Sequence, residues 1–354
     1  MKRIRDRLLS YIGRGEGCRQ IGVVIALVLL GAATVYGQVR LSSGRAPVRL
    51  VVYAFSTQEE VFTQGVFPAF EAAWEAETGR DLTIDGIFGP SGTLAGQINL
   101  GAPADVAIFS HAQHVTNLKV GRRVQERNQA ATIGCTPMVI VTRSGNPAGL
   151  SDLASLARPG LNLLHADPRS SGAGHWAVLA EYGSGFLPAR DAAAGQARLA
   201  EIWRNVRLLG PSARAAMTLF ELGAGDALIT YEQDAILARE RGVPLEIVVP
   251  PQTVVAEHVA VIVDDNVTAS ERPVAQALVD FLLGEAGQEI LGRYHLRPPD
   301  CGGDGFQAVA QPFRVEELGG WSQVYRDLIE NVWQQQIEPR LDLEPAIQLL
   351  ETGE

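Results

Sequence analysis

Short apolar runs alternate along this chain with segments whose apolar residues recur every three or four positions. The first run, residues 49–55, reads RLVVYAF and predicts a β-strand. The next segment places Phe62, Val66 and Phe70 four residues apart on one face of a predicted helix, which Gly79 is expected to end. This alternation is typical of α/β proteins with a mostly parallel sheet. Further strands are predicted at 82–88, 104–109, 138–142, 161–165, 206–209, 227–230, 246–249 and 258–263, and C-terminal helices at 274–283, 285–294 and from 313 onward.

At four places a strand-like run ends in a serine with small neighbours, and a helical pattern then begins. The first turn of a helix has backbone N–H groups without intrahelical partners and the positive end of the helix dipole. Such an end binds an anion without a charged side chain, whereas a single serine there is only an N-cap. Thr57 and Glu60 also resemble a capping box. The four places are Ser56-Thr57, Ser91-Gly92, Ser170-Ser171-Gly172 and Ser212-Ala213, and their convergence would favour a receptor for a small oxyanion.

The N-terminal segment has the layout of an export signal. Six basic residues precede an uncharged apolar run at 21–36. This run is shorter than the ~20 residues of a usual membrane span. We therefore favour a signal peptide within residues 1–44 over a membrane anchor retained at 21–36. Either interpretation places the body of the chain, from about Arg45, outside the cytoplasm.

Length and charge narrow the class of function. The chain has 354 residues, of which 46% are hydrophobic, which is enough for two well-packed lobes. Its formal net charge of -10 argues against a nucleic-acid binder, which would carry a basic face. An acidic body gains nothing from long-range attraction of an anion. Any anion site must therefore work through local hydrogen-bond donors.

The cysteines and histidines predict no metal or cofactor site. Cys18 lies before the apolar run and would leave with a cleaved signal, so Cys135 and Cys301 remain. In an oxidising compartment these two form either a disulfide or two separate thiols, and the sequence leaves both open. No Cys or His spacing resembles a zinc site. The glycine-rich stretch at 302–305 lacks the Lys-Ser/Thr pair of a phosphate loop.

Six segments in a fixed order carry a family resemblance. They read GPSGTLAGQI, APADVAIF, DPRSSGAGHW, SARAAMTLFELGAGDALITYEQDAIL, VVAEHVAVIV and GQEILGRYHLRPPD. Together they resemble the sulfate- and thiosulfate-binding proteins of ATP-binding-cassette importers, over about 51–333. The resemblance implies a type II periplasmic binding-protein fold, with two α/β lobes, each a mostly parallel sheet flanked by helices. It also implies two crossing strands near 135–138 and 256–259, a first lobe of 45–134 plus 257–354, and a second lobe of 135–256.

The resemblance also implies a ligand site. In that family a dehydrated dianion is held mostly by backbone N–H groups at helix starts, with one serine hydroxyl and one indole N–H. By position the hydroxyl falls on Ser91. The chain departs from the family at Ser56, where aspartate is usual, and at Tyr231, where the family has tryptophan and where a phenol both donates and accepts. The expected ligand-binding residues are Ser56, Thr57, Ser91, Ser171, Gly172, Ala173, Ala213 and Tyr231, with Ser56, Ser171, Gly172, Ala173 and Ala213 acting through backbone N–H groups.

Several of these residues also have a purely structural interpretation. Ser91 and Ser171 can be N-caps. Arg169 is expected in a surface ion pair, whereas Arg214 fits that role and anion contact equally well. His175 is expected to cap or pack within its helix. Trp74, Trp321 and Trp333 lie on apolar stripes and are expected in the core.

The sequence therefore predicts an exported, monomeric solute-binding protein that captures sulfate or thiosulfate and docks on a membrane permease. The alternatives are a binder of molybdate or phosphate, and a tethered anion sensor if 21–36 is retained. A hydrolase is disfavoured because Gly89-Pro90-Ser91-Gly92 lacks the spacing of a nucleophile elbow. An iron(III) site at Tyr231-Glu232 is disfavoured because the other loops offer serines rather than hard ligands.

Overall fold

The computed structural model describes residues 47–303 and 305–343, so the predicted signal or anchor segment lies outside the described residues. The described chain divides into a small unit, formed by Pro47, Val48 and Trp74–Leu82, and a main unit formed by the rest. In the small unit the N–H of Val48 donates to the carbonyl of Asp81 over 2.9 Å. Among the described residues, no helix combines the length and apolar character that a membrane crossing requires.

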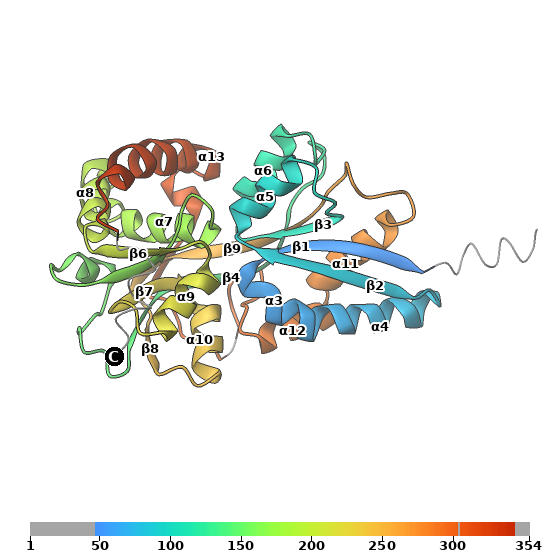
Figure 1. Cartoon of the computed structure of the whole chain (residues 1–354), viewed down its shortest axis with the longest axis horizontal. Helices are drawn as coiled ribbons and strands as arrows, with labels where there is room; N and C mark the ends of the chain where they lie inside the picture. The colour runs from blue at the N-terminus through green and yellow to red at the C-terminus, as the bar shows by residue number, and fades with distance from the viewer. Residues whose placement is uncertain (1–46, 304, 344–354) are drawn as a thin grey trace, which may run out of the picture. The chain divides into compact units, whose positions relative to one another are not determined.

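The strands of the described residues form one mixed sheet in the order β2-β1-β3-β9-β4-β7-β5-β6, with β10 beside β9 and β8 beside β4 (Figure 1). β1 and β3 are parallel, as are β5, β6 and β7, so two groups of strands follow the predicted parallel pattern. Between these groups β9 runs antiparallel to β3 and β4, and β4 runs antiparallel to β7, whereas β10 is parallel to β9. The strands are β1 Val48–Phe55, β2 Leu82–Gly89, β3 Val106–Phe109, β4 Ala131–Arg143, β5 Leu163–Ala166, β6 Val206–Gly210, β7 Ala227–Tyr231, β8 Leu245–Val248, β9 Gln252–Ile262 and β10 Gln311–Phe313.

β4 and β9 are the two long strands that connect the parallel groups. Cys135 pairs with Glu257, and Pro137 pairs with Val255, so the two segments expected to cross are neighbours in the sheet. β4 then continues along β7, where Met138 pairs with Tyr231. The division of the chain into lobes at these strands stays a prediction.

Helices pack against the sheet through apolar faces, and two buried clusters result. One cluster joins β1, β3 and β9 to α5 and α6, and it includes Phe109 and Leu118. The other joins β4, β6 and β7 to α9 and α10, and it includes Val141 and Phe220. The α-helices are α3 Glu59–Val61, α4 Phe67–Thr78, α5 Ser91–Asn99, α6 Ala112–Val120, α7 Gly172–Phe186, α8 Ala192–Trp203, α9 Ala213–Glu221, α10 Glu232–Glu240, α11 Arg272–Leu283, α12 Glu285–Arg293 and α13 Trp321–Val324.

The first predicted helix is not regular. It begins as a 3₁₀ turn, η1 Ser56–Gln58, and passes through a π-helical segment, η2 Phe62–Val66, before α4. The predicted capping box of Thr57 and Glu60 is wrong, because the 3₁₀ turn buries Thr57 and its hydroxyl has no hydrogen-bond partner. The remaining short helical segments are η3 Leu153–Ala157, η4 Val315–Leu318, η5 Tyr325–Ile337, which is π-helical, and η6 Glu338–Arg340.

Candidate functional site

Direct contacts join the four serine-led helix starts into one neighbourhood. The N–H of Gly92, at the start of α5, donates to the carbonyl of Ser170 over 2.9 Å. The hydroxyl of Ser170 donates to the carbonyl of Pro211, just before α9, over 2.8 Å. Arg214 in the first turn of α9 donates from Nε to the carbonyl of Ser56 over 3.3 Å. Four segments that are far apart in the sequence therefore meet, and this is the convergence that would favour an anion site.

Tyr231 and the start of α7 belong to the same neighbourhood. The ring of Tyr231 lies 6.1 Å from that of Phe55 at the end of β1, and 5.0 Å from that of His258 in β9, measured between centroids. A Cβ on Gly172 would lie 1.7 Å from the hydroxyl oxygen of Ser110, directly after β3. Glycine at 172 therefore allows the helix start to approach Ser110 closely.

The start of α7 supplies two of the three expected backbone donors. The N–H of Ser171 already donates to the carbonyl of Asp167 over 2.8 Å. The carbonyl of Ser171 accepts from Gly174, so the intrahelical ladder begins at that residue. Gly172 and Ala173 lie in the first turn, where N–H groups have no intrahelical acceptor. These two remain candidates for contact with a ligand.

The start of α9 has a conventional cap. The hydroxyl of Ser212 accepts the N–H of Ala215 over 3.1 Å. Ala213 lies between them, is buried, and has no intrahelical acceptor for its N–H. Ser212 thus orients the helix start, while Ala213 presents the backbone donor expected from the sequence.

Ser91 is not a helix cap. Pro90 occupies the N-cap position of α5, and no side-chain cap bond is formed there. The hydroxyl oxygen of Ser91 instead lies 2.8 Å from Nδ1 of His114 and accepts the N–H of Ser110 over 3.2 Å. When His114 donates from Nδ1, the Ser91 oxygen has two donors and its own proton is free to bind an anion.

Four buried polar atoms in this neighbourhood have no hydrogen-bond partner. Leaving one such group unpaired costs about 1–3 kcal/mol, so a cluster of them is a candidate site for a ligand that pairs with them. Hydroxyls donate readily to an anion, whereas the neutral ring of His258 already donates from Nδ1 to the carbonyl of Ser110 over 3.3 Å, so its Nε2 is an acceptor. The four atoms are Thr57 Oγ1, Ser110 Oγ, Tyr231 OH and His258 Nε2.

The donors of the site are neutral. Burial raises the pKa of the Tyr231 hydroxyl, which therefore stays protonated. The Ser110 side chain lies beside this phenol and partly offsets the rise, although the two groups do not meet hydrogen-bond geometry. Burial lowers the pKa of His258 to about 4, so its imidazole is uncharged at neutral pH. Neutral donors suit an anion that has no proton to give.

Sequence reasoning missed three residues of this neighbourhood: Ser110, His114 and His258. Ser110 was detectable, because it directly follows the buried run of β3, and ligands bind outside the carboxyl ends of parallel strands. His258 lies inside the apolar strand β9, and His114 lies on α6, so neither had a comparable signal.

Among residues outside the donor set, Arg169 and Trp333 agree with the sequence-based predictions and Trp321 does not. Arg169 pairs with Asp167 over 2.7 Å and with Glu338 over 3.1 Å, which confirms the expected ion pair. Trp333 is fully buried, as expected. The expectation for Trp321 is wrong, because this side chain is only partly buried and stacks on His111 with 4.0 Å between ring centroids.

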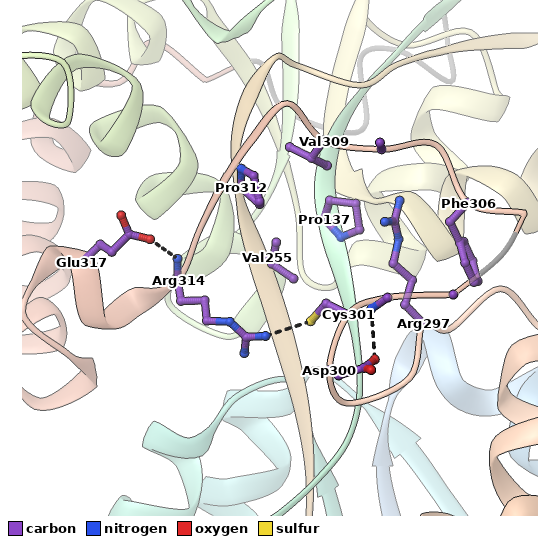
Figure 2. A pocket seen from close by; sticks show the side chains of 13 residues that line it. Pro137, Val255, Arg297, Asp300, Cys301, Phe306, Val309, Pro312, Arg314 and Glu317 are labelled. Atoms are coloured by element: carbon purple, nitrogen blue, oxygen red, sulfur yellow. Dashed lines mark hydrogen bonds between the residues drawn. The ribbon is translucent and has the colours of Figure 1, made fainter.

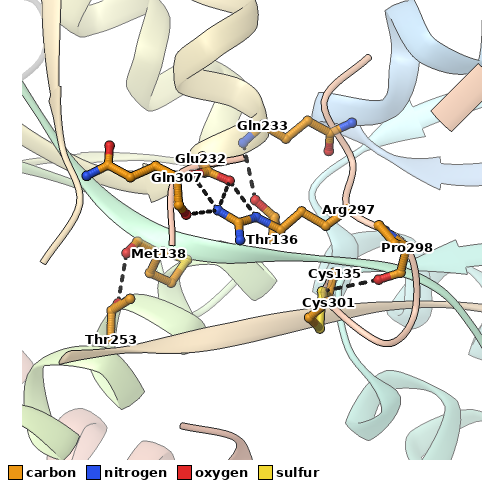
Figure 3. A network of polar contacts seen from close by, with 10 residues as sticks. All are labelled: Cys135, Thr136, Met138, Glu232, Gln233, Thr253, Arg297, Pro298, Cys301 and Gln307. Atoms are coloured by element: carbon orange, nitrogen blue, oxygen red, sulfur yellow. Dashed lines mark hydrogen bonds and ion pairs between the residues drawn. A yellow bond between two sulfur atoms is a disulfide. The ribbon is translucent and has the colours of Figure 1, made fainter. Parts of the chain in front are cut away.

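A separate pocket of about 480 Å³ lies beside the crossing strands, where Pro137 and Val255 line it (Figure 2). Both of its arginines are already paired. Arg297 forms a bidentate ion pair with Glu232, at 2.7 and 2.8 Å (Figure 3), and Arg314 pairs with Glu257. Paired guanidiniums are poor anion receptors, so this pocket is a weaker candidate than the serine-led helix starts.

The same region contains the disulfide that the sequence left open. Cys135 in β4 is bonded to Cys301, with 5.6 Å between their Cα atoms. Backbone hydrogen bonds of 2.9 and 3.0 Å between Cys135 and Arg297 support the link. The segment after α12 is thereby fastened to a crossing strand.

Comparison with known proteins assigns the chain to a family. A family model described as bacterial extracellular solute-binding protein matches residues 60–297. The sulfate-binding protein of Salmonella typhimurium is 30% identical over 80% of this chain and 91% of its own length. The thiosulfate-binding protein of Pseudomonas aeruginosa is 30% identical over 65% of this chain and 73% of its own length. The solved sulfate-binding protein SubI from Mycobacterium tuberculosis H37Rv has a TM-score of 0.73 and 28% identity, and the match covers 79% of this chain and 99% of that chain.

These matches confirm the predicted fold class, a type II periplasmic binding protein built from a mixed sheet flanked by helices. The relatives are solute-binding proteins rather than enzymes. The chain belongs to the family of bacterial extracellular solute-binding proteins, together with the sulfate- and thiosulfate-binding proteins.

Proposed function

We propose that this protein captures sulfate or thiosulfate through the converging helix starts. The observation that carries this proposal is the set of buried hydroxyls without a protein partner on Thr57, Ser110 and Tyr231. The N–H groups of Gly172, Ala173 and Ala213 add donors at two helix N-termini, where the dipole favours an anion. Ser91 adds a hydroxyl, and Ser56 a backbone N–H.

The type of donor selects the type of anion. A fully ionised dianion has only acceptor oxygens, so it is matched by N–H and O–H donors and excluded by carboxylates. Two groups are exceptions: the phenol of Tyr231 can also accept a hydrogen bond, and Nε2 of His258 can only accept one, because Nδ1 donates to the Ser110 carbonyl. A protonated oxyanion such as hydrogen phosphate can therefore compete, and this is why phosphate belongs among the test ligands.

The wider function follows from the family. We propose that the protein acts outside the cytoplasm as the monomeric receptor of an ABC importer and delivers its anion to a membrane permease. The sulfate- and thiosulfate-binding relatives support this role. Capture and release require no covalent chemistry, so no catalytic residue is assigned.

Calorimetric titration of the purified protein with sulfate, thiosulfate, molybdate and phosphate tests the proposal. We expect one saturable site per chain for sulfate or thiosulfate, and much weaker binding of phosphate. Chloride at the same ionic strength is the control for non-specific charge effects. Tight binding of molybdate alone would reassign the ligand, and the absence of binding by all four would refute an oxyanion receptor.

A further inference from the structure

Three buried histidines form a cluster next to the anion site. His111 immediately precedes α6, His114 lies in its first turn, and His175 lies in the first turn of α7. One ring nitrogen from each lies within 4.8 Å of the other two. All three side chains are at most 4% exposed. The sequence predicts a capping or packing role for His175 and no metal site, because no Cys or His spacing resembles a zinc site.

Each ring is already held in a defined orientation. Nε2 of His111 lies 2.9 Å from Nδ1 of His175, and the rings of His111 and His114 stack with 3.9 Å between centroids. Nδ1 of His114 contacts the Ser91 hydroxyl, which leaves Nε2 of that ring facing away from Ser91. The ring of His175 also lies within hydrogen-bond reach of the backbone of Pro168.

These outer contacts are the kind that metal-binding histidines make. A ligating imidazole usually gives its second N–H to an oxygen, which fixes the tautomer and orients the ring. Ser91 can do this for His114, and the Pro168 carbonyl for His175. Nδ1 of His111 is buried without a partner, so the third ring can hold its proton there once Nε2 is used.

We propose that His111, His114 and His175 bind a divalent transition-metal ion, with Zn²⁺ as the reference ion. Imidazole suits Zn²⁺, Cu²⁺ and Ni²⁺, and three histidines with one open position are an established zinc ligand set. At Zn–N distances of about 2.0–2.1 Å, two tetrahedral ligand nitrogens are roughly 3.4 Å apart. The 2.9 Å between His111 and His175 and the 4.8 Å limit for the whole set bracket that value, and the stacked rings of His111 and His114 would tilt apart to direct both nitrogens at one ion.

The metal would replace the hydrogen bond between His111 and His175 and join α6 to α7. Trp321 stacks on His111, and the ring of Tyr325 lies 5.4 Å from that of His175, so the C-terminal helical segment covers the cluster. Because Ser91 contacts a metal ligand, the ion would also fix the Nδ1–H of His114 toward the Ser91 oxygen. The proposal stands independently of which anion the protein binds.

Cobalt titration provides the test. The full chain is purified without a polyhistidine tag, treated with a chelator and titrated with Co²⁺, whose visible absorption reports coordination, and then with Zn²⁺. We expect one equivalent of Co²⁺ with a tetrahedral spectrum, displacement by Zn²⁺, and a rise in melting temperature with Zn²⁺. A wild-type protein that takes up no stoichiometric Co²⁺ would overturn the proposal.

Variants assign the ion to the cluster. His175→Ala and the more conservative His111→Gln should each weaken Zn²⁺ affinity at least 100-fold, while circular dichroism checks that the variant is folded. His295→Gln is the matched control, because His295 is partly exposed and pairs with Glu240 over 2.8 Å, outside the cluster. An equal loss in the control, or unchanged affinity in the folded cluster variants, would place the ion elsewhere. A wild-type protein that binds Zn²⁺ but does not bind sulfate or thiosulfate would refute the proposed function and leave the metal site standing.

Discussion

The Ser91 hydroxyl lies 2.8 Å from Nδ1 of His114, a contact between residues 23 positions apart. A serine at the start of a helix usually bonds to the backbone of that helix. Here the hydroxyl points instead to a neighbouring helix and accepts the N–H of Ser110. Ser91 thereby connects α5, α6 and the end of β3, and its own proton becomes available to a ligand.

Replacement of this hydroxyl should weaken anion binding. In Ser91→Ala we expect sulfate or thiosulfate affinity to fall by about 1–3 kcal/mol, because a buried donor to a charged group is lost. Calorimetric titration measures this change. Ser270→Ala, at an exposed position before α11, is the control and should bind as the wild type does. Unchanged affinity in Ser91→Ala would show that the serine serves only to position its neighbours.

Replacing Tyr231 should affect stability and anion binding in different ways. Its hydroxyl is buried without a partner, so Tyr231→Phe removes an unpaired polar group that costs about 1–3 kcal/mol. We expect the ligand-free variant to be as stable as the wild type or more stable, and its anion affinity to be lower. Thermal unfolding with and without sulfate measures both effects. A destabilised variant with normal affinity would mean that the phenol is a structural donor.

Much of the fold was predictable because it depends on local periodicity and turn chemistry. The run at 227–230 predicted β7, and the structure ends that strand one residue later, at Tyr231. Gly79 follows the last residue of α4 with a φ of +65°, the left-handed conformation that favours glycine. The serine-led helix starts were visible for the same reason.

The rest required tertiary information. The pairing of Cys135 with Glu257 depends on two segments that are 122 positions apart, and only the family resemblance indicated it. The approach of His175 to His111 depends on how α7 packs, which no local pattern in either helix encodes. At Thr57 a local motif was misleading: the sequence resembles a capping box, but the chain forms a 3₁₀ turn in which the Thr57 hydroxyl is buried without a partner.

Removing only one partner of the ion pair between Arg297 and Glu232 should strongly destabilise the fold. Both side chains are at most 8% exposed, so Arg297→Met leaves an unpaired buried carboxylate and should lower the free energy of unfolding by about 3–5 kcal/mol. Urea unfolding at pH 7 measures the loss. Burial already raises the pKa of Glu232, and Arg297 opposes that rise. Adding Glu232→Gln to Arg297→Met should therefore recover part of the stability, and a double variant no better than the single one would contradict this account.

The disulfide should stabilise the fold without contributing to the anion site. It closes a loop across 166 positions, and loss of such a link typically costs about 2–5 kcal/mol. We expect the double variant Cys135→Ser/Cys301→Ser to unfold at lower urea concentration and to keep its sulfate affinity. Thiol labelling of the unfolded wild-type chain without reductant is the control, and labelling at both Cys135 and Cys301 would show that the bond is absent in the isolated protein.

Asp264 should contribute a defined part of the acid sensitivity. Burial alone would raise the pKa of this carboxyl, but the N–H of Gln125 at 2.8 Å, the guanidinium of Arg272 at 2.7 Å and the amide of Asn128 at 3.2 Å together lower it. A carboxyl with a lowered folded-state pKa stabilises the fold above its unfolded pKa of about 3.9, and this stabilisation is lost as the pH falls through the folded value. In Asp264→Asn we therefore expect lower stability at pH 7 and a smaller decrease between pH 5 and pH 3 than in the wild type, as measured by urea midpoints. Glu246→Gln, at an exposed position of β8, should keep the wild-type pH dependence, and an Asp264→Asn protein with that same dependence would exclude this role.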